Sequence, residues 1–192
     1  EKINNETGIT ARSVWAMMTD NLGHVWFGGV GGLYKFDGKR YERFSDRKEF
    51  FGDAVMRIYQ DKNNVIWFLS FSGVSCYDTE KDSLFMPFDE KSPFYKKRIA
   101  SVYHHSNGDY WFGHSEGLTR LSNGKYSTYK INDGLPDNYI AVIIPDKNEN
   151  LWLATGKGIS KFDGKNFSNF TAKDGLRSDT PYLLIFDDDW NL

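Results

Sequence analysis

The feature that most constrains this chain is a repeat built around tryptophan. Four tryptophans occur in closely similar local sequences at intervals of 41 to 44 residues, and they are Trp26, Trp67, Trp111 and Trp152. A fixed period of 20 to 50 residues is the signature of a repeat architecture, in which each unit buries its apolar surface against its neighbours. The chain is therefore interpreted as copies of one unit before any single segment is considered.

Each unit has room for four short strands. A mostly apolar segment comes first, the tryptophan strand second, an alternating strand after a glycine third, and a short strand rich in aromatic and polar residues fourth. An aspartate that can bond its own backbone opens the first turn in three units, at Asp20, Asp61 and Asp146. Asp-Gly and Asn-Gly pairs predict two-residue type I′ turns between the third and fourth strands, at 37–38, 123–124 and 163–164.

A four-stranded sheet that is apolar on both faces must stack on copies of itself, and radial stacking gives a β-propeller. We therefore expect an all-β fold, with four four-stranded antiparallel blades plus the first strand of a fifth, as a fragment of a larger ring. The repeat tryptophans would pack between blades. The expected segments are a link from a preceding blade at 1–12, blades at 13–44, 54–88, 98–129 and 139–170, and the start of a fifth blade at 180–192. In this register Asp187 opens the fifth turn, and Trp190 falls within that turn.

Charge and composition narrow the range of partners. The formal net charge is −2, which provides no basic face of the kind that follows phosphates, so we expect no nucleic acid partner. No apolar run is long enough to span a bilayer, so we expect no membrane span in this segment. Cys76 is the only cysteine, which rules out an intrachain disulfide, and we expect it to be a small apolar residue within a strand.

One unit carries a family resemblance. From Gly134 to Gly164 it reads GLPDNYIAVIIPDKNENLWLATGKGISKFDG, which resembles the two-component regulator propeller repeat, and the resemblance covers nearly the whole chain. The second unit departs by lacking the glycine after Trp-Phe, and the third has His105 in place of the opening aspartate. The resemblance implies the periplasmic sensor region of a membrane-bound hybrid histidine kinase of Bacteroidetes type, which recognises an oligosaccharide and signals to downstream domains. Separately, the sequence contains no nucleophile elbow, phosphate-binding loop or cysteine cluster, so we expect no enzymatic activity, no cofactor and no metal.

Candidate ligand-binding residues follow from the repeat register. In a propeller, the loops that lead into the first strands lie on one face, around the central channel. The position eight residues before the repeat aspartate is polar in every unit, and it holds Arg12, Asp53, Lys97, Asn138 and Asp179. Two residues upstream lie aromatic rings that could stack on a sugar, Phe51 and Tyr95. Weaker candidates occupy the loops between second and third strands, at Phe71, His114, Glu116 and Lys157.

Other interpretations stay open. The polar residues could instead cap strand ends or line a water-filled channel. The chain could be a protein-interaction or dimerisation scaffold without a small ligand, and we expect self-association because an end blade exposes an apolar face. A propeller lyase or glycosidase would need paired carboxylates, such as Asp53 and Asp179. The adjacent His104 and His105 would point to opposite faces of a strand, so they predict no shared metal site.

Overall fold

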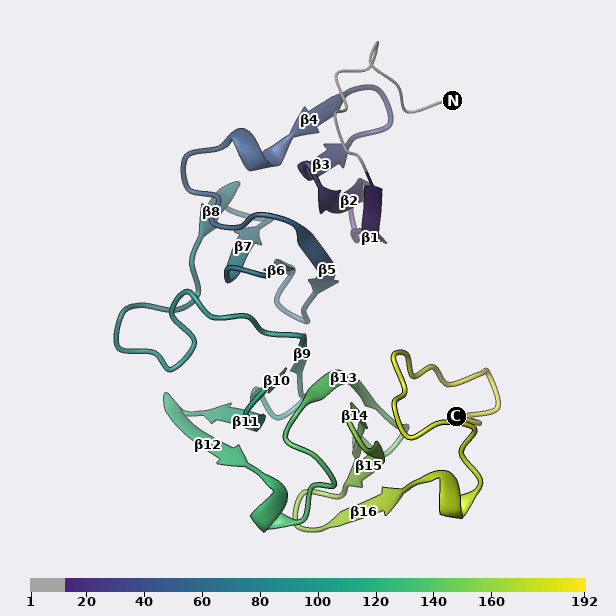
Figure 1. The fold of residues 1–192 in the computed structure, drawn as a ribbon. Coiled ribbons are helices and arrows are strands. Elements are labelled where there is room, and N and C mark those ends of the chain that lie inside the picture. The colour runs from purple at the N-terminus through teal and green to yellow at the C-terminus, as the bar shows by residue number, and fades with distance from the viewer. Residues whose placement is uncertain (1–12) are drawn as a thin grey trace. The chain divides into compact units, whose positions relative to one another are not determined.

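The computed structural model describes residues 13–192, which form two compact units that meet in sequence between Ile99 and Ala100. The first unit contains two four-stranded sheets (Figure 1). Blade 1 comprises β1 (Ser13–Thr19), β2 (Val25–Val30), β3 (Gly32–Phe36) and β4 (Tyr41–Arg43), followed by the 3-10 turn η2 (Phe44–Asp46). Blade 2 comprises β5 (Val55–Gln60), β6 (Val65–Ser70), β7 (Val74–Asp78) and β8 (Ser83–Phe85).

The second unit repeats this plan (Figure 1). Blade 3 comprises β9 (Ser101–His104), β10 (Tyr110–His114), β11 (Gly117–Ser122) and β12 (Lys125–Tyr129), followed by η3 (Ile131–Asp133). Blade 4 comprises β13 (Ile140–Pro145), β14 (Leu151–Thr155), β15 (Gly158–Phe162) and β16 (Phe167–Phe170), followed by η4 (Ala172–Asp174). In all four sheets, strands consecutive in the chain pair antiparallel, so the expectation of an all-β fold built from propeller blades is confirmed.

The repeat aspartate organises the first turn of its blade. In blade 1, Asp20 Oδ1 accepts the backbone N–H groups of Leu22 and His24, at 3.0 and 2.9 Å. Its Oδ2 accepts the indole N–H of Trp26 at 2.8 Å, and both the aspartate and the tryptophan are buried. The corresponding indole bonds in blades 2 and 4 are 2.9 and 3.2 Å long. The six-residue spacing between aspartate and tryptophan therefore closes a hydrogen-bonded frame.

The repeat tryptophans of blades 1 and 3 pack against the following blade, as predicted. The Trp26 ring centroid lies 5.3 Å from that of Phe68 and 5.4 Å from that of Tyr77, both in blade 2. In the second unit, Trp111 lies 5.5 Å from Phe162 of blade 4. Rings of this size bury a large apolar area, so the repeat tryptophan contributes strongly to the packing of blade 1 on blade 2 and of blade 3 on blade 4.

A close approach of backbone and side chain tightens the packing of blades 1 and 2. A Cβ built at Gly28 would lie 2.6 Å from Val55 Cβ, closer than such atoms normally come. The glycine after Trp-Phe therefore allows β5 to lie against β2. In blade 2 the same position is Leu69, which is itself buried.

Blade 3 lacks the repeat aspartate, and the hydrogen bond from its tryptophan indole is missing in the described part of the chain. His105 replaces the aspartate, and His105 Nδ1 accepts the N–H of Asn107 at 3.2 Å, which preserves part of the turn. The buried indole N–H of Trp111 has no acceptor among residues 13–192. Arg120 lies over the Trp111 ring at 5.8 Å and pairs with Asp109 at 2.6 Å. The frame of the other blades is thus replaced here by an ion pair beside the ring.

A lysine lies over the repeat tryptophan in two further blades. Lys35 Nζ is 5.3 Å from the Trp26 ring, and Lys161 Nζ is 5.3 Å from the Trp152 ring. Blade 2 has Cys76 at the equivalent position, and the residue is fully buried, which confirms the expected apolar role. Burial raises the pKa of the Cys76 thiol well above its usual value, so the sulfur stays protonated and unreactive.

Two of the predicted hairpin turns are wrong in length. Only Asn123 and Gly124 form a two-residue loop with positive φ at both residues, 49° and 75°. In blades 1 and 4 the flanking pairs Phe36↔Tyr41 and Phe162↔Phe167 enclose four-residue loops. Their opening aspartates accept the N–H groups two and three residues ahead, as Asp37 does from Lys39 and Arg40. This side-chain bonding stabilises the longer loop.

The expected first strand of a fifth blade is not formed. No strand is assigned after η4, because residues 180–192 have no ladder partner among the described residues. The turn that was expected to follow it is present, since Asp187 Oδ1 accepts the N–H groups of Asp189 and Asn191 at 3.0 and 2.8 Å. Trp190 has φ 64°, which matches φ 61° at Glu149 in the equivalent turn of blade 4.

The first strands differ in burial and share a β-bulge. β13 is buried over its first four residues, whereas β1 alternates between exposed and half-buried residues, with Met17 74% exposed. In blades 1, 2 and 4 the ladder between first and second strands skips one residue near its start, and these residues are Trp15, Met56 and Ala141. An inserted residue of this kind interrupts the alternation of side chains between the two faces of the strand, and it bends the strand.

Candidate functional site

The candidate residues lie at one end of each blade. Antiparallel connection places the start of the first strand and the loop between second and third strands at the same end, which we call the leading end. The turns between first and second strands and between third and fourth strands lie at the trailing end. Arg12, the first predicted ligand residue, is outside the described residues.

In the first unit, the structure brings two predicted aromatic residues together around a lysine. Lys96 Nζ lies 5.7 Å from the Phe51 ring centroid and 5.0 Å from that of Tyr95. Phe51 is anchored by its backbone, whose N–H donates to Ser75 Oγ at 2.8 Å and whose carbonyl accepts from the same hydroxyl at 2.7 Å. The lysine was not among the predicted site residues, and it has φ 51°, an uncommon left-handed conformation for a non-glycine residue.

The two polar site residues predicted in this unit face solvent. Asp53 and Lys97 are both exposed, and neither side chain makes a hydrogen bond or ion pair within residues 13–99. Both groups are thus accessible at the leading end. Their contact with a ligand stays a prediction.

In the second unit, the two predicted polar residues cap 3-10 turns. Asn138 Oδ1 accepts the N–H of Ile131 at 2.9 Å, at the start of η3. Asp179 Oδ1 accepts the N–H of Ala172 at 2.5 Å, at the start of η4. Each bond spans seven residues, and the bond at Asn138 ties the beginning of blade 4 to the link before it. This geometry is what the capping interpretation expects, and a sugar contact at these residues stays a prediction.

The weaker candidates are distributed between bonded and exposed positions. His114 Nε2 is 2.8 Å from Thr119 Oγ1, which is 2.8 Å from Thr128 Oγ1, so the imidazole belongs to a chain of hydroxyls. Lys157 Nζ is 3.9 Å from Asp137 Oδ2. Phe71 is 45% exposed and contacts Trp15 and Arg98, neither of which was predicted.

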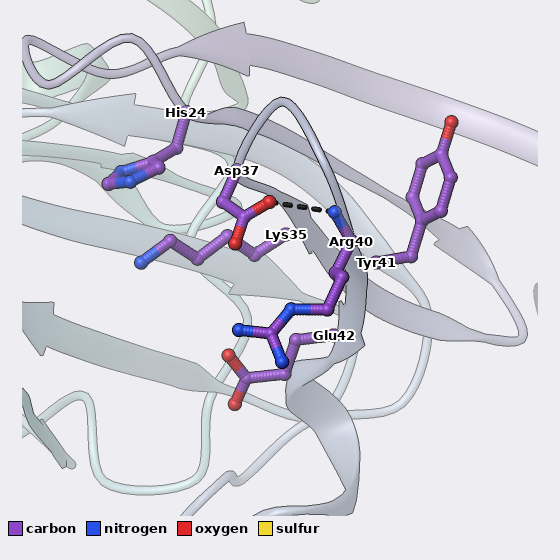
Figure 2. Close-up of a pocket in the computed structure, with 6 residues that line it drawn as sticks. All are labelled: His24, Lys35, Asp37, Arg40, Tyr41 and Glu42. Atoms are coloured by element: carbon purple, nitrogen blue, oxygen red, sulfur yellow. Dashed lines mark hydrogen bonds between the residues drawn. The ribbon is translucent and has the colours of Figure 1, made fainter.

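A polar hollow of about 420 Å³ lies at the trailing end of blade 1 (Figure 2). Its lining mixes both charge signs, from His24, Lys35, Asp37, Arg40, Tyr41 and Glu42. Asp37 is engaged in its own turn, and His24 Nδ1 lies 3.1 Å from Asp20 Oδ2 (Figure 2 shows the Asp37 bond). Burial would raise the pKa of Asp20, but hydrogen bonds from Trp26 and His24 outweigh it and hold the pKa below its usual value. The hollow thus lies over the structural frame of the blade.

The described residues show no group of three or more His, Cys, Asp or Glu side chains that could hold a metal ion. Between residues 13 and 192, no helix is both long and apolar enough to cross a membrane.

The frame of aspartate and tryptophan corresponds to a known repeat. Residues 134–157, from the link after η3 through β14, match the family described as two component regulator propeller. Over these residues the chain is similar to one two component regulator propeller repeat. The resemblance predicted from the sequence is therefore confirmed over these residues. Blades 1 and 2 contain the same bond between indole and aspartate as blade 4. A comparison with curated proteins finds no match.

Solved structures share the propeller fold at low identity. The extracellular domain described as that of a hybrid two component system from B. thetaiotaomicron has a TM-score of 0.76 and 21% identity, covering 92% of this chain and 27% of that one. PorZ, a surface component of the type-IX secretion system of Porphyromonas gingivalis, has a TM-score of 0.73 and 19% identity, covering 98% and 32%.

A propeller enzyme is also similar. A virginiamycin B lyase from Staphylococcus aureus, in a structure with quinupristin, has a TM-score of 0.61 and 16% identity, covering 82% of this chain and 55% of the lyase. At these identities the likeness concerns the fold, and one fold supports many functions. The chain spans about a quarter to a third of the two bacterial surface proteins.

Proposed function

We propose that the chain is part of the ligand-sensing propeller of a two component signalling protein. In this proposal the propeller lies in the periplasm, recognises an oligosaccharide, and transmits binding to downstream signalling domains. The repeat supports the signalling context. The fold likeness to an extracellular domain of a hybrid two component system supports an extracytoplasmic location.

The observation that carries the ligand class is the pair of rings at the leading end of blade 2. Phe51 and Tyr95 are half-buried, and their ring centroids lie 5.7 and 5.0 Å from Lys96 Nζ, with Asp53 exposed nearby in sequence. Flat aromatic faces stack on sugar rings, and charged side chains bond sugar hydroxyls. Phe51 is held by two backbone hydrogen bonds, so this platform is positioned before a ligand arrives.

The test is calorimetric titration of the chain with a panel of neutral and acidic glycan fragments. We expect at least one fragment to bind, and Tyr95→Ala and Asp53→Ala to weaken that binding without lowering thermal stability. Tyr126→Ala is the matched control, because Tyr126 is 37% exposed on β12, a fourth strand. Silence across the whole panel would refute the proposal. Release of a product from any fragment would favour the lyase or glycosidase alternative.

A second candidate function, a dimerisation scaffold, is favoured by β1. Three apolar residues of this strand are exposed, and they are Val14 at 47%, Trp15 at 48% and Met17 at 74%. Contiguous exposed apolar surface commonly marks an interaction site. Sedimentation should show association that weakens in Met17→Glu. A monomer over the whole accessible concentration range would rule this candidate out.

A further inference from the structure

Two large aromatic side chains from different blades lie exposed side by side at the leading end of the first unit. Trp15 and Phe71 are 48% and 45% exposed, and their ring centroids are 5.9 Å apart at an interplanar angle of 89°. The Arg98 guanidinium lies 4.9 Å from the Phe71 centroid. A cation over one ring of an exposed aromatic pair is an arrangement that suits ligand binding better than core packing.

Gly73 connects this pair to the rings of blade 2. A Cβ at Gly73 would lie 2.7 Å from Phe51 Cε1 and 3.5 Å from Lys96 Cα, so the loop between β6 and β7 packs directly against both residues. Phe71 belongs to the same loop. The two clusters therefore form one basic aromatic surface, which we define by Trp15, Phe51, Phe71, Tyr95, Lys96 and Arg98.

The charge of this surface is strongly positive for an acidic chain. Lys96, Lys97 and Arg98 are consecutive and exposed, and none forms an ion pair within residues 13–99. The segments 50–53 and 95–98 lead into β5 and β9, and Asp53 is the one carboxylate that they contain. The rest of the chain carries more acidic than basic side chains, since the net charge of the whole chain is −2.

We propose that the basic aromatic surface binds an acidic oligosaccharide. The sugar rings stack on the exposed aromatic faces, and carboxylate or sulfate groups pair with Arg98 and Lys96. A guanidinium stacked on a ring keeps its N–H edge free for two parallel bonds to such an anion. The inference rests on the proposed function, and it adds the charge of the ligand and the contribution of blade 1. The net negative charge of the chain disfavours a nucleic acid, which carries a phosphate at every unit.

The test compares matched sugar probes by calorimetry on the chain. The probes are oligogalacturonate and its fully methyl-esterified form, and dextran sulfate fragments and unmodified dextran of the same length. We expect at least one acidic probe to bind roughly tenfold more tightly than its neutral partner. Binding should weaken between about 50 and 500 mM salt, because ions screen exposed charges. An oligothymidylate of equal charge that binds more tightly than either acidic sugar would overturn the proposal.

Variants then locate the site. Arg98→Gln and Trp15→Ala should each weaken the acidic probe about tenfold, through loss of the anion contact and of a stacking face. Lys39→Gln removes an exposed lysine at the trailing end of blade 1 and should leave affinity unchanged. A thermal melt of each variant checks that the fold is retained.

The outcomes separate this inference from the proposed function. Binding of a neutral sugar alone, or of an acidic sugar unaffected by both variants, overturns the inference and leaves the sensor proposal in place. Silence toward every sugar, including the wider glycan panel, overturns both.

Discussion

The unpaired indole of Trp111 makes a direct prediction about stability. Changing His105→Asp restores the residue that accepts the indole N–H in the other blades, where this bond is 2.8 to 3.2 Å long. A carboxylate at this position would also lie near Arg120, which already stacks over the Trp111 ring, as Lys161 does beside Asp146 in blade 4. We therefore expect His105→Asp to stabilise the second unit.

The magnitude follows from the cost of a buried, unbonded donor. Such a group costs about 1 to 3 kcal/mol, and a hydrogen bond to a charged acceptor contributes about as much. The substitution also removes the contact of His105 Nδ1 with Glu149, at 3.6 Å, and adds a negative charge near that residue. It places a carboxylate near Asp109 as well, because the residue four positions after the repeat aspartate contacts it in blades 1 and 4. The pairing of Asp109 with Arg120 offsets part of this repulsion. A net gain of about 1 kcal/mol should remain, which corresponds to roughly 2 to 4 °C in melting temperature for a domain of this size.

A double-mutant cycle isolates the hydrogen bond from these side effects. His105→Asp is measured by urea unfolding in the natural background and together with Trp111→Phe, which keeps an aromatic ring and removes the N–H. The coupling free energy should be about 1 to 3 kcal/mol in favour of the aspartate with tryptophan. As an internal control, Trp26→Phe should cost more than Trp111→Phe, because only Trp26 loses a bond. Equal effects of His105→Asp in both backgrounds would refute the reasoning.

Three further predictions concern the same framework. Trp26→Ala should destabilise the chain by about 3 to 5 kcal/mol in urea unfolding, because it leaves a cavity in the core. Trp190 is 48% exposed, so Trp190→Ala should cost much less, and similar costs for the two substitutions would contradict the packing role of Trp26. Gly28→Ala should cost about 1 to 3 kcal/mol in urea unfolding, because its Cβ would lie 2.6 Å from Val55 Cβ, an atom that Val55→Ala would keep; a neutral Gly28→Ala would show that β5 can shift freely. Burial would raise the pKa of Asp146, but hydrogen bonds from Asn150, Trp152 and Lys161 lower it well below its usual value. Its contribution to stability is therefore fully present above the unfolded carboxyl pKa of about 4 and is lost as the pH falls toward the lower pKa of the folded state. Asp146→Asn should thus reduce the loss of unfolding free energy between neutral and acidic pH, and an unchanged loss would contradict this.

The strand order and the tryptophan packing could be predicted because they depend on local geometry. An aspartate six residues before a tryptophan sets the turn, the strand that follows it and the buried ring within one short segment. The hairpin lengths were harder, since Asp-Gly fits both a two-residue turn and a four-residue loop closed by the aspartate side chain. The unformed strand at 180–192 shows a different limit, because a strand needs a partner as well as a suitable sequence.

The site was only partly predictable for chemical reasons. Asn138 and Asp179 have side chains that suit a sugar hydroxyl and a backbone N–H equally well, so composition could not distinguish ligand binding from capping. Phe71 and Arg98 meet across 27 positions of the chain, and Trp15 reaches them from another blade. The repeat period of the sequence does not predict contacts between these side chains.

The β-bulge near the start of β1, β5 and β13 places one residue of each strand outside the ladder. The residues it inserts, Trp15, Met56 and Ala141, lie outside the ladder, so they can range from a large ring to a methyl group without altering the register of any neighbour. In blade 1 this residue, Trp15, is exposed, whereas in blade 4 Ala141 is buried in the core. If the basic aromatic surface binds the proposed ligand, exchanging Trp15 would change the ligand preference of blade 1 and leave its core and its aspartate–tryptophan frame as they are.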